Sequence, residues 1–116
     1  MRAEVNYFEW PDLERRGFDT SGVASTLLVF AARPIGGAGG ETFQVTVCTP
    51  EGLSELIARD GLVMGRHHLF VSAIDTTTVE DFIRDRLRRL DGDTWPQLAE
   101  KIGRIGYWEF EDYTEQ

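Results

Sequence analysis

The sequence predicts a single α+β domain in which helices cover one face of a mainly antiparallel sheet. The chain has 116 residues, enough for one hydrophobic core, whereas two independent cores would each be too small. In several segments apolar residues alternate with polar ones, which is typical of strands, and in three others they recur at helical spacing. In chain order these segments predict β-β-β-α-β-α-α-β within one domain, residues 1–116.

Two strands are expected in the first third of the chain. Residues 4–10 alternate, with aromatic residues on both faces, and Pro11 is expected to end this strand. Residues 12–22 are charged and polar, so we expect a loop there. Residues 23–33 form a β-branched and apolar run that is typical of a more deeply buried strand, and Pro34 ends it.

Residues 35–40 contain four glycines, and two interpretations of this segment differ in function. The backbone amides of a glycine-rich loop can bind a phosphate. Phosphate-binding loops, however, continue into Gly-Lys-Ser/Thr and a helix, and neither follows here. Residues 41–48 alternate like a half-buried strand, so we expect a hairpin connection between two antiparallel strands.

The first helix is expected to begin after Thr49. Thr49 is a favourable N-cap, Pro50 is tolerated at the first helical position, and Glu51 complements the positive end of the helix dipole. We expect this helix to end near Gly61 and a further strand to lie within residues 62–74. The expected apolar face of the helix consists of Leu53, Leu56 and Ile57.

A second helix is expected to begin at Thr78, as N-cap, after a polar turn. Acids lie early in this helix and arginines late, as the helix dipole favours. Glu80 with Arg84, and Asp85 with Arg89, are favourable i,i+4 pairs. We therefore interpret its arginines as a charge-balanced solvent face rather than a nucleic-acid site. The expected apolar stripe consists of Val79, Phe82, Ile83, Leu87 and Leu90.

The third helix has the clearest start signal, because Thr94 and Gln97 have the spacing of a capping box. We expect Gly106 to end it in the left-handed conformation, since Ile102 and Tyr107 would then make the apolar contact that accompanies such a cap. The buried face of this helix is expected to consist of Trp95, Leu98, Ala99 and Ile102.

Residues 107–113 alternate again and predict a last strand. Trp108 and Phe110 share one face of it, where they are either core residues or anchors of a protein interface; the alternation favours core for the pair. The same alternation directs Glu109 and Glu111 outward.

Half of the net charge of −8 lies in residues 107–116, which contain four acids and neither lysine nor arginine. Such a field repels nucleic-acid phosphates and attracts basic protein surfaces over a screening length of about 8 Å. The alternative is that the charge serves only solubility. If the charge serves a partner, we expect a protein with a basic surface rather than a nucleic acid.

The chain shows no sign of secretion or membrane insertion. Its single cysteine, Cys48, allows no internal disulfide, which fits a reducing compartment. The first ten residues lack the apolar run of a targeting signal, and the longest apolar stretch, residues 27–32, is far too short to span a bilayer. We expect a cytoplasmic protein without a membrane partner; the sequence does not indicate its oligomeric state.

Few residues suggest catalysis or metal binding. His67 and His68 are adjacent in an expected strand, so their side chains should point to opposite faces and not bind one metal. Cys48 could act as a nucleophile only beside a base that lowers its thiol pKa, and its neighbours include no basic cluster. We expect no enzyme, no cofactor and no metal, with a thiol enzyme as a remote alternative.

Three segments resemble a known family: CTPEGL at residues 48–53, GRHHLFV at 65–71 and GDTWPQLAEKIGRIGYWEFEDY at 92–113. They are similar to the Imm8-type immunity proteins, which are encoded beside bacterial polymorphic toxins. The resemblance covers most of the chain after Phe43, in the same order, and WEFED is its most specific part. It implies a cytoplasmic, non-catalytic protein that binds and neutralises a cognate toxin.

The expected partner-binding residues are the outward acids of the last segment: Glu109, Glu111 and Asp112. Asp91 and Asp93, before the third helix, form a second candidate group. We expect them to meet a basic surface of the toxin and to inhibit it stoichiometrically. The alternative function is a general interaction or scaffold module of a secretion system, which would bind a partner without neutralising it.

Overall fold

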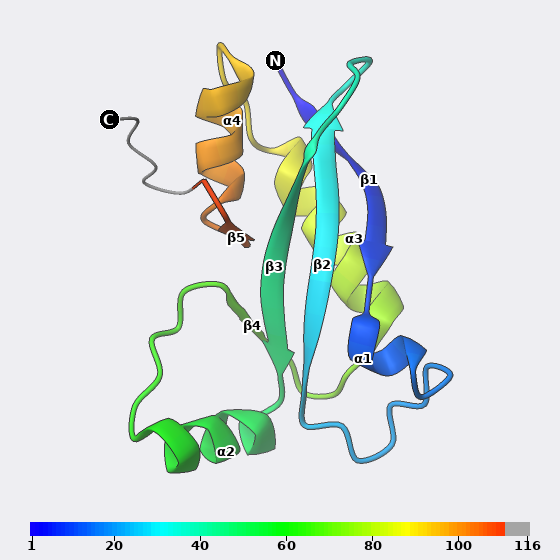
Figure 1. The fold of residues 1–116 in the computed structure, drawn as a ribbon, viewed down its shortest axis with the longest axis vertical. Helices are drawn as coiled ribbons and strands as arrows, with labels where there is room; N and C mark the ends of the chain where they lie inside the picture. Colours follow the sequence, from blue (N-terminus) through cyan, green and yellow to red (C-terminus); the bar gives the residue numbers. More distant parts are fainter. Residues whose placement is uncertain (111–116) are drawn as a thin grey trace.

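A computed structural model of the chain, described here for residues 1–110, contains a five-stranded sheet flanked by helices (Figure 1). The sheet confirms the α+β class. Its strands follow the order β1-β2-β3-β4, and β5 also pairs with β3. The elements are β1 (Ala3–Glu9), α1 (Pro11–Glu14), β2 (Ser25–Pro34), β3 (Glu41–Cys48), α2 (Pro50–Asp60), β4 (His68–Phe70), α3 (Thr76–Arg88), α4 (Trp95–Ile102) and β5 (Tyr107–Trp108).

Strand β3 has two partners along its outer edge. Near its start it pairs with β5 in an antiparallel register that sets Phe43 opposite Trp108. Near its end it pairs with β4 in parallel, because α2 crosses over between them. All other pairings are antiparallel, and β2 and β3 form the expected hairpin around the glycine-rich loop.

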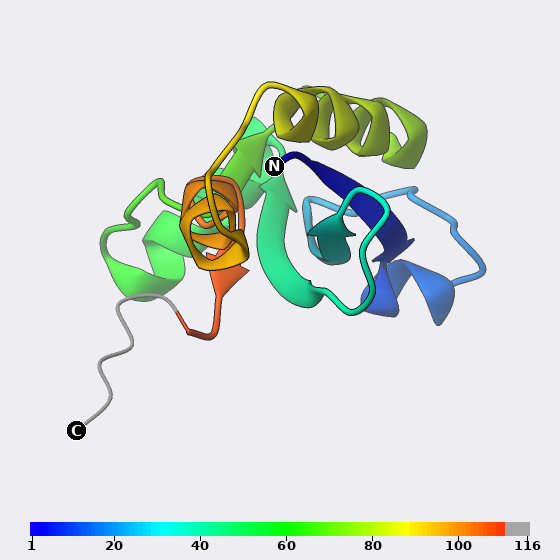
Figure 2. The same cartoon turned by 90° about the horizontal axis from the view of Figure 1, so that it is seen from above.

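The hydrophobic core lies between one face of the sheet and helices α3 and α4, as Figure 2 shows from above. Aromatic rings form its centre: Phe30 stacks on Phe43 with ring centroids 5.3 Å apart, and Phe43 stacks on Trp108 at 6.4 Å. The helices cover these rings with apolar side chains that are all buried: Val79, Ile83, Leu87, Leu98, Ala99 and Ile102.

The first strand leads directly into a short helix, so our prediction of a loop over residues 12–22 is wrong at its start. Pro11 occupies the first turn of α1, where its missing N–H costs nothing, and Leu13 is fully buried against the sheet. Trp10 is buried as well, and its indole N–H donates to Glu80 Oε2 at 2.9 Å. This bond ties the end of β1 to α3.

The N-cap of α3 is Asp75, so our prediction of Thr78 as the N-cap is wrong. The carboxylate of Asp75 accepts a hydrogen bond from the Thr78 amide at 3.2 Å, and Asp75 has the extended backbone of a cap. Residues 76–78 are therefore the first turn. The expected ion pairs are confirmed, with N–O distances of 3.8 Å for Glu80–Arg84 and 2.7 Å for Asp85–Arg89.

The N-cap of α4 is confirmed, but its C-terminal end is not the one predicted. Thr94 Oγ1 accepts from the Gln97 amide at 3.3 Å, while Gln97 Oε1 accepts from the Asp93 amide at 3.1 Å. Gly103 is the C-cap, in the right-handed conformation, and Gly106 does not have a positive φ. A Cβ on Gly106 would lie 2.9 Å from Phe43 Cβ. Gly106 is thus required for close packing, not for a left-handed cap.

Helix α2 lies at the end of the sheet, away from α3 and α4 (Figure 1). Its caps are as predicted: Thr49 Oγ1 accepts from the Gly52 amide at 3.2 Å, and Gly61 is left-handed with φ 83°. Of its apolar face, Leu53 and Leu56 are half-buried and Ile57 is 43% exposed. The strand expected within residues 62–74 is confirmed but has three residues only. None of the helices in residues 1–110 has the length and hydropathy of a membrane span.

Candidate protein-binding site

Glu109 lies at a hollow of about 460 Å³ beside the glycine-rich loop. Tyr7, Ala31 and Thr42 form a row across β1, β2 and β3, because Ala31 pairs with both of the others. The row alternates with Phe30 and Phe43, so it lies on the sheet face opposite α3 and α4. The residues that line the hollow are Asn6, Tyr7, Ala31, Gly39, Gly40, Glu41, Thr42, Trp108, Glu109 and Phe110.

The pairing of β5 with β3 holds Glu109 in this position. Trp108 is 8% exposed and packs on Phe43, which fixes the backbone immediately before Glu109. Gly106 allows this close approach, since any side chain there would collide with Phe43 and with Phe30. The Glu109 side chain itself is exposed. The burial of Trp108 therefore positions the carboxylate of the next residue in solvent.

Glu41 is a second carboxylate at the hollow, and its environment disfavours the charged form of its side chain. Burial raises the pKa of Glu41, the nearby Trp108 indole opposes this shift, and the negative charge of Glu109 raises the pKa further. Glu41 Oε2 and Trp108 Nε1 are buried, and neither forms a well-aligned hydrogen bond with the described residues. A hydrogen-bond donor or a cation entering the hollow would therefore relieve a cost that the free protein bears.

Aromatic side chains at the hollow are exposed in part. Phe110 is 43% exposed, and its ring meets Trp108 edge to face at 5.7 Å. Tyr7 is 45% exposed. The prediction of a core role for both Trp108 and Phe110 is thus correct for Trp108 and wrong for Phe110. Aromatic side chains are enriched at protein-binding surfaces.

The structure brings only some of the predicted site residues to this hollow. Glu109 lines it, whereas Asp91 and Asp93 lie in the connection between α3 and α4 and do not. Both are exposed, and Asp91 Oδ1 lies 3.9 Å from Lys101 Nζ. Glu111 and Asp112 lie outside the described residues.

Glu41 and Tyr7 were not among the residues expected at the site. Local alternation can indicate that Glu109 points outward, but it says nothing about which distant strand lies beside it. The usable signal for Glu41 was its place at the start of a strand directly after the glycine-rich loop. Had the antiparallel β3–β5 pairing been anticipated, Glu41 would have been expected near Glu109.

Cys48, His67 and His68 each have a different environment. Cys48 is fully buried, and burial raises the pKa of its thiol, which disfavours the reactive thiolate. His67 Nε2 lies 2.7 Å from the Gly103 carbonyl, whereas His68 Nδ1 lies 2.9 Å from the Arg66 carbonyl. Within residues 1–110, no group of three His, Cys, Asp or Glu side chains is placed to hold a metal ion.

Residues 4–113 match the family described as Imm8, immunity protein 8. No curated protein and no solved structure matches the chain. The match includes every strand and helix except the first residue of β1, and it includes the residues that line the hollow. Since it covers nearly the whole chain, this protein belongs to the Imm8 family of immunity proteins.

Proposed function

We propose that the protein binds a cognate bacterial polymorphic toxin in the cytoplasm and neutralises it stoichiometrically, without catalysis. The hollow at Glu41 and Glu109 is the proposed contact with a basic surface of the toxin. Membership in an immunity protein family supports the class of function. The chemistry of the hollow supports the choice of surface.

The observation that carries the proposed site is that the buried Glu41 carboxylate lies near a second acid, Glu109. Glu41 Oε2 is buried without a well-aligned hydrogen bond to the described residues, and Glu109 raises the pKa of Glu41. A lysine or arginine side chain of the toxin would supply both the missing donors and the opposite charge. Binding would then replace an unfavourable local arrangement by charge-assisted hydrogen bonds.

The surroundings of the two acids suit a protein partner. Phe110 and Tyr7 provide partly exposed aromatic surface that a partner can cover, and such surfaces supply most of the energy of many interfaces. The acids add long-range attraction, which raises the association rate with a basic surface. We propose that inhibition follows from coverage of the toxin's active site or of its substrate-binding surface.

Co-expression with the toxin encoded beside this protein tests the proposal. The wild-type chain should restore growth of cells that produce the toxin, and Glu109→Lys should weaken this rescue because it places a positive charge at the hollow. Glu55→Lys is the matched control, since Glu55 is an exposed acid on α2 and does not line the hollow.

Both variants should keep the melting temperature of the wild-type chain, because both side chains are exposed. Full rescue by a folded Glu109→Lys variant would show that another surface binds the toxin. Binding of the toxin by the wild-type chain without any rescue would favour the scaffold alternative and contradict neutralisation.

A further inference from the structure

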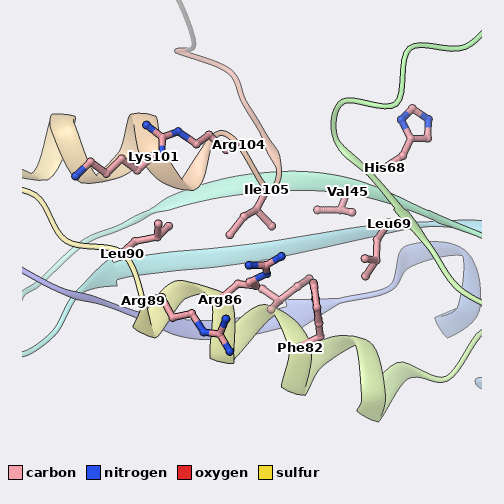
Figure 3. Close-up of a pocket in the computed structure, with 11 residues that line it drawn as sticks. Val45, His68, Leu69, Phe82, Arg86, Arg89, Leu90, Lys101, Arg104 and Ile105 are labelled. Atoms are coloured by element: carbon pink, nitrogen blue, oxygen red, sulfur yellow. The ribbon is translucent and has the colours of Figure 1, made fainter.

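A second hollow, of about 420 Å³, lies between α3 and α4 on the helix-covered face of the sheet (Figure 3). We call it the basic groove. Its floor is apolar, with Val45 from β3, Leu69 from β4 and Ile105 after α4. Its rim is cationic: Arg86 in the last turn of α3 and Arg89 directly after this helix lie on one side, and Lys101 and Arg104 lie on the other. The sign of this rim is opposite to the net charge of −8 of the whole chain.

Two of the four rim cations are neutralised within the protein. Arg89 Nη2 lies 2.7 Å from Asp85 Oδ2. Lys101 Nζ lies 3.9 Å from Asp91 Oδ1 and donates to the Asp91 carbonyl at 2.5 Å. These two cations are held by neighbouring acidic residues, so they contribute less to binding of an anion.

Arg86 and Arg104 are available to pair with an anionic ligand. Neither forms an ion pair within the described part of the chain. The guanidinium of Arg86 lies over the ring of Phe82, 5.3 Å from its centroid. Both residues are exposed and line the groove from opposite sides. A bound carboxylate could therefore meet a cation from each side.

The apolar floor restricts the kind of anion. Phe82 is 43% exposed, and Leu69, Leu90 and Ile105 are only partly buried, so apolar surface remains in water between the cations. A phosphate or sulfate would leave this surface uncovered. An apolar side chain would cover it, at about 25 cal/mol per Å² removed from water.

We propose that the basic groove binds an acidic segment of a partner protein, in which carboxylates flank an apolar anchor side chain. The anchor covers the floor at Leu69 and Ile105, and the flanking carboxylates pair with Arg86 and Arg104. Charge complementarity carries the choice of occupant, because an acidic protein would otherwise repel such a segment. Nucleic acid fits less well, since Asp85 and Asp91 stand beside the rim cations.

The groove and the hollow at Glu109 are separate sites, because no residue lines both of them. The inference is therefore independent of toxin neutralisation, and each can fail while the other stands.

Three short peptides can probe the groove in the intact chain by nuclear magnetic resonance. The first is acetyl-Glu-Glu-Leu-Phe-Glu-Glu-amide, which carries both acids and an apolar centre. The second replaces the glutamates by lysines, and the third replaces the apolar centre by two glycines. The first should shift the amide signals of Leu69, Leu90 and Ile105 saturably, and raised ionic strength should weaken its binding. The other two should bind about tenfold more weakly or not at all.

A double variant and a matched control locate the binding. Arg86→Glu with Arg104→Glu should weaken the first peptide about tenfold, since two rim charges are reversed. Arg88→Glu with Arg59→Glu makes the same charge change outside the groove and should leave its affinity unchanged. Arg86 and Arg88 both lie in the last turn of α3, so the cost to helix stability is matched.

Several results would overturn the proposal. One is equal binding of the first and third peptides, which would reduce the groove to a general anion site. Another is absence of binding by the first peptide, or shifts confined to residues outside the groove. A third is reversible self-association of the chain that the double variant abolishes, since the occupant would then be a second copy.

Discussion

Phe43 and Trp108 are paired twice in this structure. They are opposite residues in the antiparallel register of β3 and β5, and their rings stack with centroids 6.4 Å apart. The contact joins the central hairpin to the segment that carries Glu109. Through this contact the core of the protein positions an exposed carboxylate at the proposed toxin-binding surface.

Trp108→Ala should destabilise the fold strongly. Trp108 is 8% exposed and packs between Phe43 and Phe110, and truncation of a buried tryptophan costs about 3–5 kcal/mol. Phe110→Ala should cost much less, because Phe110 is partly exposed. Urea denaturation of both variants measures the difference. Equal losses of stability would mean that the two rings contribute alike to the core.

Gly106→Ala should destabilise the protein although the backbone of Gly106 does not require glycine. A Cβ at this position would lie 2.9 Å from Phe43 Cβ and 3.1 Å from Phe30 Cε1, and such overpacking costs about 1–3 kcal/mol. Gly61→Ala is an informative comparison, because no atom lies within 4 Å of its Cβ and only its positive φ is unfavourable. A Gly106→Ala variant as stable as wild type in thermal denaturation would contradict the close packing.

Asp75→Ala should shorten or weaken α3, while Thr78→Ala should have little effect. Asp75 accepts the cap hydrogen bond from the Thr78 amide, and loss of an N-cap costs about 1 kcal/mol. The Thr78 side chain is exposed in the first turn. Denaturation curves of the two variants decide between the caps, and the reverse order of stability would restore Thr78 as N-cap.

Glu41→Gln should stabilise the protein near neutral pH. The pKa of Glu41 is raised above its ordinary value of 4.5, so the folded state binds this proton more tightly than the unfolded state. The resulting stability is fully present below pH 4.5 and is lost as the pH rises through the raised pKa. Glutamine carries no charge and removes this loss.

The measurement is the free energy of unfolding from about pH 4 to pH 7, across the ordinary carboxyl range and above it. The Glu41→Gln variant should gain on wild type as the pH rises. Glu55→Gln, at an exposed position on α2, is the control and should follow the wild-type curve. Parallel curves for wild type and Glu41→Gln would mean that the buried carboxyl is not perturbed.

Local signals in the sequence predicted the sheet hairpin and two of the helix starts. The alternation of residues 41–48 coincides with β3, and Thr49 and Thr94 cap helices as expected. These features depend on contacts within a few residues, which a sequence pattern records directly. For α3 two cap-forming residues lie close together, and Asp75 is the one with the extended backbone of a cap.

Features that depend on distant contacts were not predictable in this way. Gly106 resembles a helix cap in sequence, but its role is set by Phe30 and Phe43, which approach it from β2 and β3. The position of Glu41 beside Glu109 likewise follows from the β3–β5 pairing. The apolar face of α2 is only partly covered, because helical periodicity does not determine whether another element packs on such a face.

The affinity of the purified toxin for this protein tests the central claim most directly. Isothermal titration should give a dissociation constant at least about tenfold higher for Glu41→Gln with Glu109→Gln than for wild type, because the toxin's cation would lose both carboxylates. Glu14→Gln with Glu55→Gln removes the same charge at exposed positions outside the hollow and should bind like wild type. Equal affinities for all three proteins would contradict the assignment of this hollow as the toxin-binding site.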